Sequence, residues 1–142
     1  MHLAKRIKKY KGENLRINSG DNDSCFDVIE IKDSYLFEPE RFYLGESYES
    51  VGIPDDYAGM LEKIHGPWLP GSIHPNAPLV VAGSPLHHIV FEFNYPHGMA
   101  VHEWAPICLM NLIPLDRKPE NPYGGRYKGQ SGVQTSLSHR GL

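Results

Sequence analysis

Short apolar segments separated by turn-forming residues run through most of the chain. They lie at 26–31 (FDVIEI), 41–44 (RFYL), 79–81 (LVV), 88–93 (HIVFEF) and 107–115 (ICLMNLIPL). Each is bounded by Gly, Pro, Asn or Asp, which is typical of short strands in an all-β sandwich or barrel. Ten of the 12 prolines fall between Pro67 and Pro122, which excludes a long helix from the second half. The pattern therefore predicts an all-β fold.

The pattern does not decide the structure of two stretches. Segment 55–64 (DDYAGMLEKI) could form one or two helical turns after an aspartate cap, or another strand, because the spacing of its apolar positions fits neither clearly. Segment 121–142 is rich in Gly, Ser and Gln and has few apolar anchors, so by itself it would be a mobile tail.

Size and composition fit one domain, residues 1–142. No apolar run has the length of a membrane helix, and the start of the chain is basic without an apolar core behind it. We therefore expect a soluble cytoplasmic protein with no membrane partner. The two cysteines, Cys25 and Cys108, are too few for a disulfide framework and are expected to be reduced.

The net charge of −3 is unevenly distributed. Residues 1–12 carry five Lys or Arg and no acid, whereas residues 13–62 are strongly acidic. This balance argues against nucleic acid as a partner, because phosphate binding needs a broad basic face. We expect the basic N-terminal extension, residues 1–20, to be a frayed, solvated terminus, although its cluster of cations could also contact RNA or an acidic partner.

The histidines and cysteines do not have the spacing of a metal site. Two distant cysteines cannot supply the thiolate ligands of the zinc-dependent nucleobase deaminases. The sequence therefore predicts no metal ligands, and any deamination of a base would proceed without zinc.

Glu92 is the most informative acid of the second half. Strand alternation places it on one face with Val90, opposite Phe91 and Phe93. Such a carboxylate either faces water or lies desolvated in a pocket, where a raised pKa would suit a general acid or base. Segment 121–132 (NPYGGRYKGQSG) combines cations, hydroxyls and glycines that could wrap a polyphosphate, or it could be a floppy polar tail.

Five segments together resemble the dCTP deaminase branch of the trimeric dUTPase-like superfamily. They are 36–45 (LFEPERFYLG), 48–59 (YESVGIPDDYAG), 89–93 (IVFEF), 107–110 (ICLM) and 122–130 (PYGGRYKGQ), and they occur in the order found in that family. The resemblance covers about two thirds of the chain. It implies a distorted all-β barrel or jelly roll, assembled as a homotrimer with ligand sites shared between subunits.

The resemblance also implies residue roles. The family's catalytic glutamate corresponds to Glu92, which would activate water for attack on C4 of cytosine. The tail, 121–142, would close over the triphosphate of a deoxynucleotide. Its substrate-binding residues would be Tyr123, Arg126, Tyr127, Lys128 and Gln130.

The chain departs from the family where an Arg-Ser-Ser signature is expected. Segment 62–72 (EKIHGPWLPGS) has no Ser-Ser pair and no arginine. We expect Lys63 and His65 to take over the missing catalytic roles and Ser72 to contribute to substrate binding, with His65 serving as a proton carrier near neutral pH.

The resulting hypothesis is a zinc-independent hydrolytic deamination of dCTP to dUTP, or a close variant. No cofactor would be required, and Mg²⁺ could accompany the triphosphate. Two alternatives remain open: a pyrophosphatase acting on dUTP or another deoxynucleoside triphosphate, and a catalytically inactive descendant that binds a nucleotide or a protein.

Overall fold

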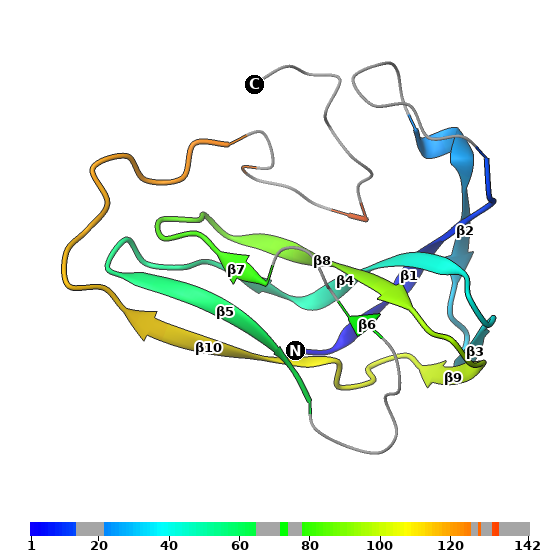
Figure 1. Cartoon of the computed structure of the whole chain (residues 1–142). Helices are drawn as coiled ribbons and strands as arrows, with labels where there is room; N and C mark the ends of the chain where they lie inside the picture. Colours follow the sequence, from blue (N-terminus) through cyan, green and yellow to red (C-terminus); the bar gives the residue numbers. More distant parts are fainter. Residues whose placement is uncertain (14–21, 65–71, 74–77, 126–127, 129–131, 134–142) are drawn as a thin grey trace.

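The computed structural model describes residues 1–13, 22–64, 72–73, 78–125, 128 and 132–133. Within these ranges the regular structure consists of three antiparallel β-sheets and one short 3-10 helix (Figure 1). The predicted all-β class is therefore confirmed. No helix in the ranges given above is long and apolar enough to cross a membrane.

The largest sheet has five strands in the order β2-β1-β4-β8-β6. Its strands are β1 (Leu3–Tyr10), β2 (Phe26–Glu30), β4 (Phe42–Val51), β6 (Ser72–Ile73) and β8 (His87–Asn94). The second sheet, in the order β10-β5-β7, comprises β5 (Tyr57–Lys63), β7 (Leu79–Val80) and β10 (Cys108–Pro114). A two-stranded sheet pairs β3 (Ser34–Phe37) with β9 (Met99–His102), and the 3-10 helix η1 spans Asp23–Cys25.

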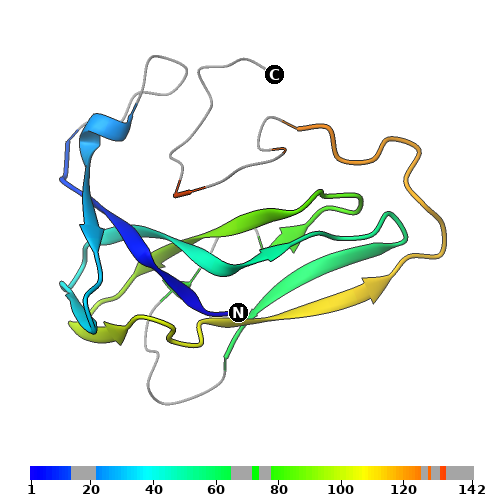
Figure 2. The ribbon, with the colours of Figure 1, turned by 180° about the vertical axis from the view of Figure 1, so that it is seen from behind.

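The main apolar core is built from residues of the five-stranded and three-stranded sheets. Strands β4 and β8 of the first lie above β5 and β10 of the second in Figure 1 and again in the reverse view of Figure 2. The five-stranded sheet contributes Ile89, Phe91 and Phe93 from β8. The opposing sheet contributes Leu61 and Cys108. Because burial of a large apolar side chain contributes about 1.5–3 kcal/mol, this inner face of β8 anchors the fold.

Gly45 lets two strands approach closely inside this core. A Cβ atom at Gly45 would lie 2.7 Å from Leu3 Cδ1 and 2.8 Å from Phe93 Cε2. Any larger residue would displace β1 or the Phe93 ring, so the glycine is a packing requirement of the β1–β4–β8 contact.

The expectation of a frayed, solvated terminus over residues 1–20 is wrong for residues 3–10, while residues 14–20 lie outside the described residues. Residues 3–10 form β1, which lies between β2 and β4 inside the five-stranded sheet. Leu3 and Ile7 are fully buried and anchor the strand in the core. The Lys8 amine lies 2.7 Å from Asp23 Oδ1, and the Lys9 amine donates to Glu38. The cations are thus accommodated by acidic partners while the strand is held by its apolar residues.

The two alternatives for segment 55–64 are resolved in favour of a strand. Strand β5 pairs with β10 without interruption from Tyr57 opposite Pro114 to Lys63 opposite Cys108. On its other side Gly59 pairs with Val80 of β7, so β5 is the central strand of the three-stranded sheet.

Candidate active site

The outer face of the five-stranded sheet carries the candidate site. Along β8, Ile89, Phe91 and Phe93 are buried in the core, whereas Val90 and Glu92 point to the opposite face and are half-buried. Leu44 of β4 lies opposite Glu92 in the register. The side-chain alternation that the sequence predicts for 89–93 is therefore present.

Glu92 is held with one carboxylate oxygen out of contact with water. Its Oε2 atom is buried and has no hydrogen-bond partner within the described residues. An unpartnered buried acceptor costs free energy unless a ligand, water or neighbouring chain supplies a donor. Of the two alternatives left open by the sequence, free exposure to water does not describe this oxygen.

A second carboxylate, Glu46, lies on the same face and was not anticipated. It stands opposite Val90, which places it diagonally from Glu92 across the β4–β8 pair. Its Oε2 atom is also buried without a partner in the described part of the chain. Burial raises the pKa of Glu46, while the charges of His88 and Arg6 act in the opposite direction. The only sequence signal for it is its position directly after the apolar run 42–45.

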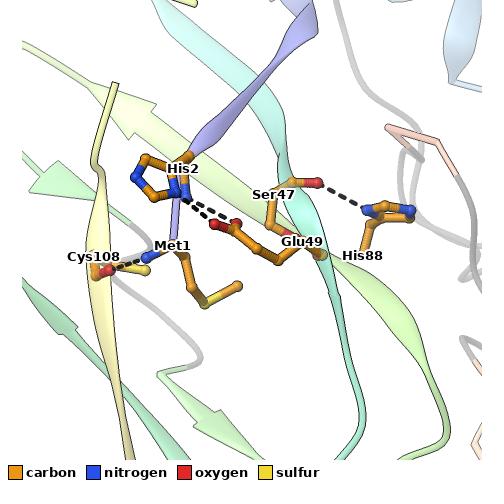
Figure 3. Close-up of polar contacts among 6 residues, drawn as sticks. All are labelled: Met1, His2, Ser47, Glu49, His88 and Cys108. Carbon is orange, nitrogen blue, oxygen red and sulfur yellow. Dashed lines mark hydrogen bonds and ion pairs between the residues drawn. The ribbon is translucent and has the colours of Figure 1, made fainter. Parts of the chain in front are cut away.

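The strands are irregular beside Glu46. Between Glu46 and Ser50 the β4–β8 register shifts, and Ser47 holds the bulge together. Ser47 Oγ donates to the Glu49 carbonyl at 2.7 Å and accepts from the Ile89 amide at 2.9 Å. The Ser47 carbonyl accepts from His88 Nδ1 at 2.8 Å, as Figure 3 shows. Because a carbonyl only accepts, the His88 proton sits on Nδ1.

The two residues that precede β1 join it to this region. The His2 amide donates to Glu49 Oε2 at 2.9 Å, and the His2 ring contacts the other oxygen of that carboxylate (Figure 3). The Met1 amine donates to the Cys108 carbonyl at 2.7 Å. These contacts tie β1 to both β4 and β10, and so fix the strand that borders Glu46.

The C-terminal segment reaches the outer face. Val133 is buried in a small apolar cluster with Cys25, Phe26 and Leu44, and Val90 packs against the same cluster. Leu44 is also the cross-strand neighbour of Glu92. Val133 therefore covers the sheet beside Glu92.

The described part of the predicted tail has two further features. The Tyr123 amide donates to the Ala82 carbonyl at 3.4 Å, and the Tyr123 ring lies so close to Gly125 that a Cβ there would overlap it. Lys128 is exposed, and its amide donates to the Gly125 carbonyl. Arg126, Tyr127 and Gln130 lie outside the described residues, so their predicted contacts with substrate stay predictions.

The other predicted residues are not gathered around Glu92. Lys63 ends β5 in the three-stranded sheet, across the core from the face that carries Glu92. Ser72 is placed only by its backbone, which pairs with Asn94 at the edge of the five-stranded sheet. His65 lies outside the described residues. One chain therefore does not bring Lys63 to Glu92.

The thiols are unsuited to nucleophilic or ligand roles. Cys25 and Cys108 are both free and buried. Burial raises the pKa of Cys108 to about 11, against the opposing effect of the N-terminal charge, so the thiolate form is scarce at neutral pH. Among the residues that the structure describes, no three His, Cys, Asp or Glu side chains are grouped to hold a metal ion.

Comparison with known proteins finds similar curated proteins. No family model matches it. Curated proteins named "dCTP deaminase, dUMP-forming" are similar along most of its length. The one from Aquifex aeolicus is 27% identical over 140 residues, which cover 98% of this chain and 77% of the relative. The chain is thus similar to dCTP deaminases along almost its whole length, at low identity.

Other dCTP deaminases are matched over less of their own length. The protein from Pseudarthrobacter chlorophenolicus is 29% identical over 119 residues, covering 78% of this chain and 62% of the relative. The protein from Mycolicibacterium smegmatis is 30% identical over 113 residues, covering 74% and 59%. The chain therefore spans about three fifths of these two dCTP deaminases. The all-β sheets are consistent with the dUTPase-like fold of this branch.

Proposed function

We propose that this protein is a hydrolase that deaminates dCTP. Water adds to C4 of cytosine, the C4–N4 bond breaks and ammonia leaves, which gives dUTP. The relatives are named for dUMP formation, so we further propose that a second water cleaves the α–β phosphate bond. The balanced reaction is then dCTP plus two waters giving dUMP, diphosphate and ammonia.

The observation that supports this proposal is the bare Oε2 atom of Glu92 on a covered sheet face. A carboxylate with an unused lone pair can accept a proton from water as that water attacks C4, and can return it to the departing amine. Val133 beside it supports the proposal that the C-terminal segment limits access of bulk water.

The remaining roles require a second copy of the chain. Lys63 lies across the core from Glu92, so a site that contains both must join two subunits. We propose the homotrimer expected from the family resemblance, with Lys63 and His65 assisting catalysis and Ser72 binding substrate. No step uses zinc, and Mg²⁺ would enter with the triphosphate. Cytoplasmic location stays a prediction.

The proposed tail supplies the phosphate site. Lys128 is exposed and therefore available to an anionic ligand, and a charged donor binds phosphate oxygens strongly. The residues proposed to bind the triphosphate are Tyr123, Arg126, Tyr127, Lys128 and Gln130.

The test is to incubate the purified protein with dCTP and to quantify ammonia, dUTP, dUMP and diphosphate. Glu92→Gln keeps the side-chain shape and removes the base, so turnover is expected to fall by about 100- to 10,000-fold. Thermal stabilisation by dCTP should persist in that variant. Glu30→Gln is the matched control, because Glu30 is an exposed carboxylate of the same sheet.

The products separate the proposal from its alternatives. Diphosphate without ammonia would identify a pyrophosphatase instead of a deaminase. Stabilisation by nucleotides with neither product would identify an inactive binding protein. Unchanged turnover in Glu92→Gln would overturn the role assigned to Glu92. If ammonia forms and dUTP is the end product, the proposed deamination holds and the proposed cleavage of the α–β phosphate bond is wrong.

A further inference from the structure

A hollow of about 270 Å³ opens beside Glu46, apart from the residues assigned to catalysis. It forms where two strands carry extra residues. Leu3 and Ile7 of β1 pair with Ser47 and Gly45 of β4. Three residues separate the positions on β1, whereas Glu46 alone separates those on β4. Bulges of this kind redirect side chains and often border functional sites. The hollow therefore results from the register of the sheet and is not a loose surface groove.

A carboxylate and an imidazole line the hollow. Glu46 contributes a carboxylate whose Oε2 atom has no partner in the described residues. His88 also lines it, and its Nδ1 is engaged with the Ser47 carbonyl. A ligand that fits the Glu46 carboxylate must offer a hydrogen-bond donor.

Two aromatic rings form another wall. Tyr48 and Trp104 pack with their centroids 3.9 Å apart, yet they remain 53% and 48% exposed. Trp104 has φ of 65°, a left-handed conformation that costs a bulky residue free energy and is found preferentially at ligand sites. Its amide donates to the Leu3 carbonyl at 3.2 Å, which holds it against β1. Because the two rings are tilted by 48° to each other, a planar ligand can stack on one of them and contact the edge of the other.

The surrounding charge is positive. Lys5 lines the hollow, Arg6 lies in the same bulge, and both are exposed. These cations disfavour a cationic ligand and favour one that carries an anion beyond its planar part. The volume, somewhat below the roughly 300–1,000 Å³ of drug-sized sites, suits a nucleobase.

We propose that this hollow binds the amino-bearing base of a nucleotide. The exocyclic amine donates to Glu46, the base packs against the Trp104–Tyr48 ring pair, and the phosphate is attracted by Lys5 and Arg6. The base could belong to the dCTP substrate or to a second nucleotide. The proposal does not depend on deamination, because the hollow does not include Glu92.

The fluorescence of Trp104 reports nucleotide binding directly. Trp68→Phe leaves Trp104 as the single tryptophan, and its fluorescence is followed while AMP or dCMP is added. We expect quenching that saturates. IMP and dUMP replace the amine by a carbonyl and should bind at least about 10-fold more weakly, since the bond to a charged acceptor is lost. Glu46→Gln should weaken AMP and dCMP by a similar factor.

The controls and outcomes are as follows. Glu30→Gln should bind like the parent protein, and Tyr48→Ala should weaken all four nucleotides through lost stacking. A higher KM for dCTP in Glu46→Gln would assign the hollow to the substrate, and an unchanged KM would assign it to a second nucleotide. No quenching in a folded protein, or equal affinity for AMP and IMP, would overturn the proposal even if dCTP is deaminated.

Discussion

The two faces of the five-stranded sheet have opposite compositions although the same strands form them. The inner face of β8 presents Ile89, Phe91 and Phe93 to a core in which they are almost fully buried. The outer face presents Val90 and Glu92, and the neighbouring strand adds Glu46. Strand alternation thus separates the residues that stabilise the fold from those available for chemistry.

The faces also differ in the kind of polar atom that lacks a hydrogen-bond partner. On the inner side, buried Ser47 both donates and accepts hydrogen bonds, whereas the neutral hydroxyl of Tyr95 in the core has no partner among the described residues. On the outer side, the unpartnered buried atoms of the described residues are carboxylate oxygens, from Glu46 and Glu92. A buried carboxylate without a donor costs free energy that a ligand or a neighbouring subunit could relieve.

The largest expected effect comes from the inner face. Phe93→Ala should destabilise the protein by about 3–5 kcal/mol, because it removes a fully buried ring and leaves a cavity. Val90→Ala, three positions earlier on the outer face, should cost about 1 kcal/mol. Urea unfolding of both variants measures the difference. Equal losses would mean that the outer face is packed as tightly as the core.

Gly45→Ala probes the close approach of β1 and Phe93. The added methyl would overlap Leu3 and the Phe93 ring, so a loss of about 1–3 kcal/mol is expected from overpacking. Gly124→Ala is the control, since nothing lies within 4 Å of its Cβ position. Thermal unfolding compares the two, and a neutral Gly45→Ala would show that β1 can shift freely.

Val133→Ala tests whether the C-terminal segment belongs to the outer face. Loss of two methyl groups from its apolar cluster should cost about 1–2 kcal/mol. If the segment closes over substrate, the KM for dCTP should rise as well. Leu86→Ala, at a side chain that is 70% exposed, should change neither quantity. If Val133→Ala changes neither the stability nor the KM for dCTP, the C-terminal segment is not part of the site.

The smallest expected effect has the opposite sign. Burial raises the pKa of Glu46, so the folded protein disfavours its carboxylate and loses stability as pH rises through that pKa. Glu46→Gln cannot titrate and should be more stable by about 1 kcal/mol at neutral pH. The gain should disappear in acid, where the carboxyl is protonated in both states. Urea unfolding across pH measures it, and destabilisation at neutral pH would indicate that a partner satisfies the carboxylate.

The sequence predicts the features that depend on neighbouring residues, but not those that depend on pairing between segments far apart in the chain. The strand at 89–93 and the face of Glu92 follow from alternation within five residues. Strand β1 was missed because a lysine, Lys5, stands between its two apolar anchors, Leu3 and Ile7, and four of its eight residues are cationic. The burial of Glu46 depends on pairing with residues far away in the chain, so no local pattern could identify it.

Both register shifts beside Glu46 add an even number of residues to one of the two strands. From Leu3 to Ile7 the chain advances four positions while β4 advances two, and from Glu46 to Ser50 it again advances four against two on β8. Each excess is an even number, so every side chain beyond it keeps its side of the sheet. Homologous proteins could therefore gain or lose this hollow through a two-residue insertion or deletion, with no change in the order of inward and outward residues.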